Sequence, residues 1–226
     1  MDEQLTHSCA DCLLAGCGDP KDGKHPAFCE GAEITEAERR RMVEAYKGDD
    51  LKMEQAALEA TDLVGREGLC RVEETMAFMR RMGYRKIGIA NCGALQREAV
   101  IVAKILRNHG WEVFGTSCKF GSIPASEFGC NEESGANPQA MSCNPIEQAR
   151  RLNEQGTDFN LIIGLCVGHD SLFMKHSSVP CSTLIVKDRA LGNNPSAALQ
   201  NCDVPASVWF RLSKVNESLT AQRLVI

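Results

Sequence analysis

Apolar residues recur along this chain with two different periods, and the period changes near residue 85. Before that point apolar positions return every three to four residues, which predicts helices over about 35–47, 50–64 and 71–82. Thr35-Glu36-Ala37-Glu38 forms a capping box at the start of the first helix, where the Thr35 hydroxyl and the Glu38 carboxylate can satisfy exposed amides. The first thirty residues show neither a helical nor a strand-like apolar period and have few apolar side chains. We therefore expect that a bound metal or a similar cross-link is needed to hold this segment folded.

After residue 85 short apolar runs alternate with helical patterns. Strands are predicted at 86–91, 111–116, 159–165 and 182–186, and helices at 94–109 and 143–155. A glycine-rich loop follows the second predicted strand and extends to residue 142. Residues typical of turns occur after Leu191, so we predict no fifth strand there. This alternation is typical of a parallel sheet covered by helices on both faces.

The chain therefore divides into three predicted parts. A cysteine-rich metal knuckle occupies residues 1–32, a helical segment occupies 33–83, and a small Rossmann-like α/β domain with a parallel sheet occupies 84–226. The excess of acidic over basic residues lies within the first two parts, which indicates that they differ in role from the α/β domain.

The amino-acid composition argues against some classes of function and favours others. The 226 residues are 43% hydrophobic and 24% charged, which is ordinary for a globular chain, and the net charge of −5 disfavours nucleic acid as a partner. No apolar run is long enough to span a bilayer, and the first residues do not resemble a signal peptide. We therefore expect a cytoplasmic protein with neither a nucleic-acid nor a membrane partner. In that reducing compartment, twelve cysteines indicate metal binding or thiol chemistry in place of disulfides.

Four of the cysteines gather near the amino terminus with the spacing C-x2-C-x4-C-x11-C; they are Cys9, Cys12, Cys17 and Cys29. Gly16 and Gly18 allow the chain to fold back, so four thiolates can complete a tetrahedral shell. Zinc and a 4Fe-4S iron–sulfur cluster both suit such a site. His7 and His25 lie near enough in sequence to replace a cysteine, but we favour the interpretation that they are exposed polar histidines.

A second set of cysteines falls at the ends of predicted strands or the start of a helix: Cys92, Cys118, Cys143 and Cys166. Carboxyl ends of parallel strands meet at one edge of the sheet, where ligands bind in open α/β folds. Cys143 joins this edge only if the loop 117–142 folds there and brings the helix start with it. We expect a cysteine-ligated iron–sulfur centre at this edge. The alternative is that these cysteines are small buried apolar residues, a reading that we give to Cys70, Cys181 and Cys202, whereas Cys130 is a spare ligand.

Catalytic candidates lie beside this second set. Gly168 allows a tight turn after the third strand and places His169 and Asp170 at the rim of the sheet, where an imidazole can move protons near neutral pH. Asp170 can equally cap the short helix that follows it. Lys119 adjoins Cys118 and can lower its pKa, which would make Cys118 an activated thiol.

Several of these stretches together resemble a known family. They are Ile87-Gly88-Ile89-Ala90-Asn91-Cys92-Gly93, Cys118-Lys119, Cys143-Asn144-Pro145-Ile146-Glu147-Gln148-Ala149, Gly164-Leu165-Cys166-Val167-Gly168-His169-Asp170 and Val186-Lys187-Asp188-Arg189. With the four-cysteine amino terminus, they resemble the domain of unknown function 1847 family of prokaryotes. The resemblance implies metal binding by Cys9, Cys12, Cys17 and Cys29, and it places the strand-end cysteines within family motifs. One departure is Asn193-Asn194-Pro195, where the family pattern leads us to expect a histidine before Asn-Pro.

Two hypotheses about function follow from these features. The first is a metalloprotein with a structural site at the amino terminus and an iron–sulfur centre at the sheet edge, which performs redox or sulfur-transfer chemistry on a small molecule or with a redox partner protein. The second is a zinc-binding or metal-carrier protein without enzymatic activity, which uses the acidic segment 33–83 as a docking surface. Nucleotide binding finds no support, because the chain contains neither G-x-G-x-x-G nor a Walker motif.

Overall fold

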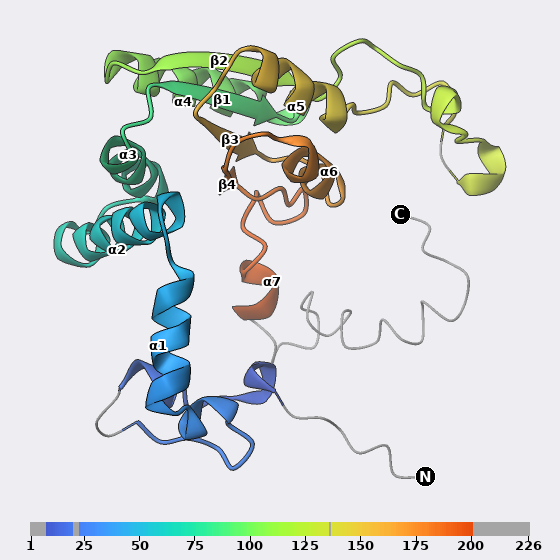
Figure 1. Ribbon diagram of the computed structural model, residues 1–226. Helices are drawn as coiled ribbons and strands as arrows, with labels where there is room; N and C mark the ends of the chain where they lie inside the picture. Colours follow the sequence, from blue (N-terminus) through green and yellow to red (C-terminus); the bar gives the residue numbers. More distant parts are fainter. Residues whose placement is uncertain (1–7, 20–22, 136, 201–226) are drawn as a thin grey trace, which may run out of the picture. The chain divides into compact units, whose positions relative to one another are not determined.

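The computed structural model of the protein describes residues 8–19, 23–135 and 137–200 (Figure 1). The helices are α1 (Glu36–Ala45), α2 (Asp49–Glu67), α3 (Arg71–Met82), α4 (Gln96–Asn108), α5 (Pro145–Glu154), α6 (His169–His176) and α7 (Ala197–Gln200), and the strands are β1 (Lys86–Asn91), β2 (Glu112–Ser117), β3 (Phe159–Ile163) and β4 (Cys181–Ile185). The chain forms two compact units, Met1–Ala57 and Leu58–Ile226, whose boundary falls within α2. The three-part division that we derived from the sequence stays a prediction.

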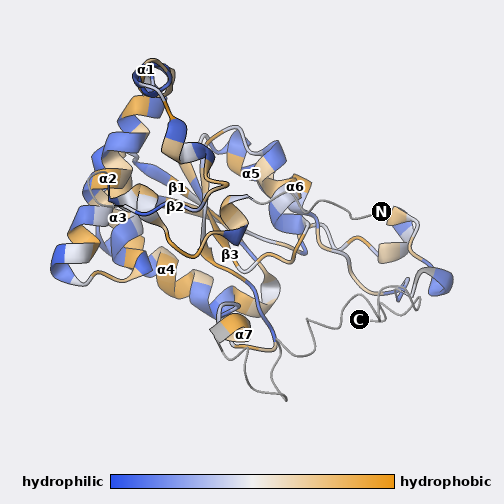
Figure 2. Ribbon diagram, turned by 90° about the horizontal axis from the view of Figure 1, so that it is seen from below, coloured by the Kyte–Doolittle hydropathy of each residue, from blue (hydrophilic) through white to orange (hydrophobic). Residues whose placement is uncertain are grey.

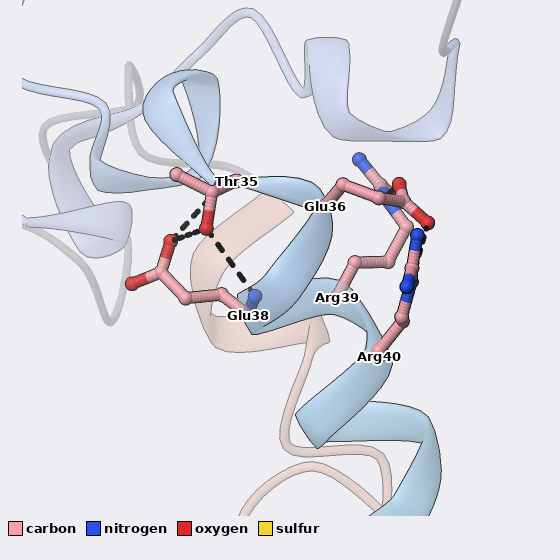
Figure 3. A network of polar contacts seen from close by, with 5 residues as sticks. All are labelled: Thr35, Glu36, Glu38, Arg39 and Arg40. Atoms are coloured by element: carbon pink, nitrogen blue, oxygen red, sulfur yellow. Dashed lines mark hydrogen bonds and ion pairs between the residues drawn. The ribbon is translucent and has the colours of Figure 1, made fainter.

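The first unit is built from short turns and helix α1. Three 3₁₀ turns, at Cys9–Asp11, Gly16–Gly18 and Glu30–Glu33, shape the cysteine-rich segment before the helix. The predicted capping box is confirmed: the Glu38 amide donates to Thr35 Oγ1 at 3.3 Å, and the Thr35 amide donates to Glu38 Oε2 at 2.9 Å (Figure 3). In the same turn Glu36 pairs with Arg39 and Arg40, all of them exposed. The hydroxyl and carboxylate of this box therefore fix where α1 begins.

The second unit contains a four-stranded, all-parallel sheet with the order β2-β1-β3-β4. This confirms the predicted α/β fold with a parallel sheet. The strand ends differ slightly from the prediction: β2 lies one residue later, and β3 ends at Ile163 instead of Leu165. Gly164 ends β3 because its φ of +63° leaves the extended region of the backbone.

Helices cover both faces of this sheet. α4 and α5 each pack against β1 and β2, and Figure 2 shows them on opposite sides of the strands. That arrangement follows from right-handed crossovers, since the chain moves from β1 outward to β2 and then back past β1 to β3. The core between the layers consists of fully buried aliphatic and aromatic side chains, among them Ile87, Ile89, Leu106, Leu152, Leu161, Ile162 and Phe173.

Turns at the carboxyl ends of β1, β2 and β3 all meet one edge of the sheet. Cys92 directly follows β1, Cys118 directly follows β2, and Cys166 lies three residues beyond the end of β3. Among the helices of the described residues, none is long and apolar enough to cross a membrane.

Candidate metal-binding sites

The four amino-terminal cysteines line a single pocket in the first unit. This pocket has a volume of about 450 Å³, and its lining includes Cys9, Cys12, Cys17 and Cys29 together with His25. Nδ1 of His25 lies 3.5 Å from Sγ of Cys29, so the imidazole is beside this set of sulfurs. The predicted knuckle thus has its four cysteines around one space, and His25, one of the two histidines suggested as substitute ligands, lies there too, whereas His7 lies outside the described residues.

Two glycines allow the knuckle to close this tightly. A Cβ atom on Gly16 would lie 2.1 Å from the carbonyl oxygen of Lys24, and one on Gly23 would lie 2.0 Å from the carbonyl oxygen of Gly16. The segments around residues 16 and 23 therefore touch backbone to backbone, which only glycine permits. Of the described residues in 8–33, Gly16 alone is buried, so apolar packing contributes little to this fold.

The second set of cysteines lies at the carboxyl edge of the sheet, and the backbone fixes three of them relative to one another. The Cys92 amide donates to the Ile163 carbonyl at 3.0 Å, and the Cys118 amide donates to the Asn91 carbonyl at 2.9 Å. The long loop after β2 returns to this edge, because the Asn144 amide donates to the Cys118 carbonyl at 2.7 Å. That hydrogen bond brings Cys143 beside Cys118, which was the condition stated for Cys143 to join the set.

Neighbouring sulfurs at this edge interact with one another and with a lysine. Nζ of Lys187 lies 2.6 Å from Sγ of Cys92, and the Gly93 amide donates to Sγ of Cys118 at 3.3 Å. The Cys118 side chain is within hydrogen-bonding reach of both Cys92 and Cys143. Cys166 is near enough to act electrostatically on Cys143 and on Lys187. Cys92 and Cys118 are buried, with 6% and 2% of their surfaces exposed.

These surroundings separate the pKa values of the thiols. Burial would raise the pKa of Cys92, but the Lys187 hydrogen bond, the Ala94 amide, the Lys187 charge and the Cys118 side chain together lower it. Burial and the negative charge of Cys118, followed by the Cys118 hydrogen bond and Cys166, raise the pKa of Cys143 to about 12. In the metal-free chain Cys143 therefore stays protonated at neutral pH, whereas the thiolate of Cys92 persists to lower pH than that of an ordinary thiol.

As the side chains lie, no group of three or more His, Cys, Asp or Glu within residues 8–19, 23–135 and 137–200 has an arrangement that could hold a metal ion. The knuckle cysteines line a common space and the edge cysteines are neighbours, but neither set forms a closed coordination shell. Sulfur is the right donor for zinc or iron, and the lysine and amides at the edge suit an anionic thiolate cluster. Metal binding at either set therefore requires side-chain adjustment.

The three residues proposed as catalytic, His169, Asp170 and Lys119, make different contacts in the structure. Asp170 accepts from the amides of Gly168, at 3.0 Å, and Ser171, at 2.8 Å, so its carboxylate stabilises the start of α6. His169 has a buried Nδ1 for which the described structure offers no hydrogen-bond partner. Lys119 donates to the Met141 carbonyl and so ties down the long loop. The cation in contact with Sγ of Cys92 is instead Lys187, which lies in one of the stretches that resemble the family.

Sequence reasoning also missed Gln148, which clamps two strand ends together. Its Nε2 donates to the carbonyls of Asn91, at 3.2 Å, and Thr116, at 2.7 Å, and its side chain is completely buried. These carbonyls belong to the residues just before Cys92 and two before Cys118. A glutamine on the apolar side of a predicted helix, within the stretch that resembles the family, was the available signal.

Of the four remaining cysteines, three lie within the described residues. Cys70 is exposed and caps the start of α3, so the prediction that it is a small buried residue was wrong. Cys181 is partly buried at the start of β4, where burial raises its pKa. Cys130 lies in the loop after the short turn Ala125–Phe128, and Cys202 lies outside the described residues.

Asn193 closes the turn that follows Lys187. Its backbone has a φ of +66°, its amide donates to the Asp188 carbonyl at 2.8 Å, and its Oδ1 accepts from the Asp188 amide at 3.2 Å. Asparagine tolerates this left-handed conformation better than other residues with a Cβ. The departure from the expected histidine thus coincides with a turn that asparagine suits.

Comparison with known protein families gives a match that runs from the last cysteine of the knuckle to the next-to-last residue of β4. The family described as "Protein of unknown function (DUF1847)" matches residues 29–184. The chain belongs to the DUF1847 family. This confirms the resemblance that we drew from its motifs. The match includes Cys29, the strand-end cysteines and all of α1–α6, whereas Cys9, Cys12 and Cys17 precede it.

One relative of this DUF1847 protein is the uncharacterized protein MJ0455 of Methanocaldococcus jannaschii. The two are 41% identical over 194 residues, which cover 84% of this chain and 92% of the relative. No solved structure matches the chain. Neither the family description nor the relative's name includes a reaction or a ligand.

Proposed function

We propose that this DUF1847 protein binds thiophilic metals at two cysteine sites. Cys9, Cys12, Cys17 and Cys29 would hold zinc or an iron–sulfur cluster in a structural role. Cys92, Cys118, Cys143 and Cys166 would hold an iron–sulfur centre, which would perform redox or sulfur-transfer chemistry on a small molecule or with a redox partner protein. A cluster at the edge would supply electron transfer or a Lewis-acidic iron.

The observation that carries this proposal is the meeting of Cys92, Cys118 and Cys143 at one edge of the sheet. These residues come from two strand ends and a helix start, and only the folded chain makes them neighbours. Lys187 and the amides of Gly93 and Ala94 direct positive charge or N–H groups at the sulfurs. Such donors stabilise anionic sulfur and influence the reduction potential of iron–sulfur clusters.

The direct test is anaerobic purification of the full chain, followed by quantitation of iron, zinc and acid-labile sulfide. We expect iron and sulfide, with the broad visible absorption of an iron–sulfur cluster. The double variant Cys92→Ser/Cys166→Ser should lose the edge iron and keep the amino-terminal metal, and Cys9→Ser/Cys12→Ser should do the reverse. Cys70→Ser is the matched control, because Cys70 is exposed and lies in neither set. Loss of all metal from either double variant would contradict the division into two sites.

A zinc-binding or metal-carrier protein without enzymatic activity is the second candidate, and one feature of the first unit favours it. No residue of α1 is buried; Met42 and Val43 are exposed on it, and Tyr46 is exposed just after its end. Exposed apolar side chains at the end of a helix suit the docking of another protein. A colourless anaerobic preparation that contains zinc and no sulfide would favour this candidate over the iron–sulfur proposal.

A further inference from the structure

A groove between α4 and the outer strand β2 lies beside the cysteine edge. It has a volume of about 290 Å³, and its floor is apolar, with Ile89, Ala99 and Val113 among the residues that line it. β2 is an edge strand of the sheet, so the described residues place no further strand beyond it to fill this space. The groove is therefore a recess with an apolar floor and polar or charged residues on its lining, next to the outer strand of the sheet.

The two ends of the groove differ in chemistry. Lys104 and Arg107 line one end, and Asn91, Gln96 and Ser117 line the other. None of the described residues that line the groove is acidic. From Gln96 to Lys104 the helix rises about 12 Å at 1.5 Å per residue, a length comparable with an extended octanoate. The cationic end therefore lies one short aliphatic chain away from the polar end.

The polar end adjoins the cysteine edge. Asn91 and Ser117 directly precede Cys92 and Cys118, and a Cβ on Gly93 would lie 3.9 Å from the Ser117 hydroxyl oxygen. Asn91 is held by hydrogen bonds from its Nδ2 to the Cys92 carbonyl, at 3.0 Å, and to Gln96 Oε1, at 2.9 Å. A molecule lying in the groove would thus have one end at the cations and the other beside the backbone of the two buried cysteines.

A glycine leaves the groove open. Gly115 is exposed in the middle of β2 between Val113 and Ser117, and these three residues line the groove. A Cβ atom there would make only ordinary contacts, the nearest being 3.8 Å from the Ile89 carbonyl oxygen. Its backbone is extended, so the fold does not need glycine at this position. The missing side chain creates space that any other residue would occupy.

We propose that this groove binds a small aliphatic monocarboxylate, with the carboxylate at Lys104 and Arg107 and the hydrocarbon chain over the apolar floor. Arg107 already donates to the Val113 carbonyl at 2.9 Å, so the donors left at the cationic end are the Lys104 ammonium and the remaining N–H groups of the guanidinium. This small donor set matches the two oxygens of a carboxylate better than the three terminal oxygens of a phosphate monoester. The site is separate from the metal proposal and does not depend on it.

Binding of octanoate to the purified full chain, followed by calorimetry or by NMR chemical shifts, tests this site. We expect saturable binding that weakens as salt increases and that neutral octanol does not reproduce. Lys104→Glu should weaken octanoate binding roughly tenfold or more, because it replaces attraction with repulsion at the carboxylate. Lys175→Glu is the matched charge control on α6, outside the groove, and should leave the affinity unchanged.

Gly115→Val provides the second arm, since its side chain would fill the groove without straining the backbone. We expect it to abolish octanoate binding while the circular dichroism spectrum and the metal content stay those of the unaltered chain. Octanol that binds as tightly as octanoate, octyl phosphate that binds much more tightly, or full octanoate affinity in Gly115→Val would overturn the proposal. Because metal content is measured in parallel, failure of this site and failure of the metal sites are distinguishable.

Discussion

Cys92 and Lys187 are 95 positions apart in the sequence and meet at a distance of 2.6 Å. Sequence position indicated which cysteines follow the carboxyl ends of strands, because parallel strands bring those ends to one edge of the sheet. It was not enough to predict which lysine faces which sulfur. Lys119 adjoins Cys118 in sequence but donates to the Met141 carbonyl, whereas Lys187 reaches Cys92 through the course of the chain after β4. Side-chain partners across a fold depend on rotamers and loop paths that periodicity does not encode.

Removal of the Lys187 charge should shift the titration of Cys92. In the metal-free chain Lys187 favours the thiolate, so the pKa of Cys92 is lowered and the thiolate persists to lower pH than an ordinary thiol. Lys187→Met keeps the burial, which raises the pKa, and removes the hydrogen bond and the charge, so the midpoint should move to higher pH. Ultraviolet thiolate absorbance measured against pH, as the difference from chains that also contain Cys92→Ser, reports this midpoint. An unchanged midpoint, equal to that of Lys175→Met, would contradict the pairing.

Gln148 should contribute more to the free energy of unfolding than exposed residues of the same helix do. Gln148→Met keeps the side-chain length but removes two hydrogen bonds to buried carbonyls, so we expect a loss of about 1–3 kcal/mol in the free energy of unfolding. Ile146→Ala on the same helix is the control, because Ile146 is 45% exposed and makes no buried hydrogen bond, so the change should cost less than about 1 kcal/mol. Urea denaturation compares the two variants, and equal losses would argue against the clamp.

At the scale of elements, the sequence predicted the helices and strands to within a few residues and identified the start of α1 from its capping box. These features depend on local patterns of three to seven residues. The path of the loop 118–142 was not predictable, because it depends on backbone contacts between distant residues such as Asn144 and Cys118. The groove beside β2 could not be predicted either, because the strand order that leaves β2 at the edge of the sheet arises only when distant strands pair.

Two glycines in adjacent strands should respond in opposite ways to the same substitution. A Cβ on Gly88 of β1 would lie 1.9 Å from Asn160 Oδ1 and 2.8 Å from Leu152 Cδ1, both in buried residues. Gly88→Ala should therefore destabilise the chain by about 3 kcal/mol or more. Gly115→Ala has room for its methyl group and should change the stability by less than about 1 kcal/mol, in the favourable direction. Thermal or urea unfolding of both variants checks the contrast, and similar stabilities would mean that β1 adapts to the methyl group.

At the scale of the whole molecule, the two compact units depend on different forces. The second unit has a buried core of aliphatic and aromatic side chains, whereas the described part of residues 8–33 buries Gly16 alone. If metal orders the knuckle, its folding free energy comes chiefly from metal binding. Composition indicated this difference, since the first thirty residues have too few apolar groups for a core.

Chelation should therefore affect the two units unequally. We expect metal removal from the full chain to increase amide hydrogen exchange in residues 8–33 strongly, while β1, β3 and their flanking helices stay protected by the core. Hydrogen-exchange mass spectrometry before and after anaerobic chelation measures both regions at once. Readdition of zinc serves as the control for reversibility. Unchanged exchange in 8–33 after complete metal loss would show that the knuckle folds without metal.

The two sets of cysteines also differ in when they can come together as the chain is synthesised. Cys9 to Cys29 lie within one short stretch, so a ribosome exposes them all before the first helix has emerged. The edge set needs β1, β2, the returning loop and finally Lys187, and pairing of distant parallel strands is slow. A nascent chain would thus present its first four thiols to cellular metal early and its second four only after most of translation, so loading would occur in two separate episodes.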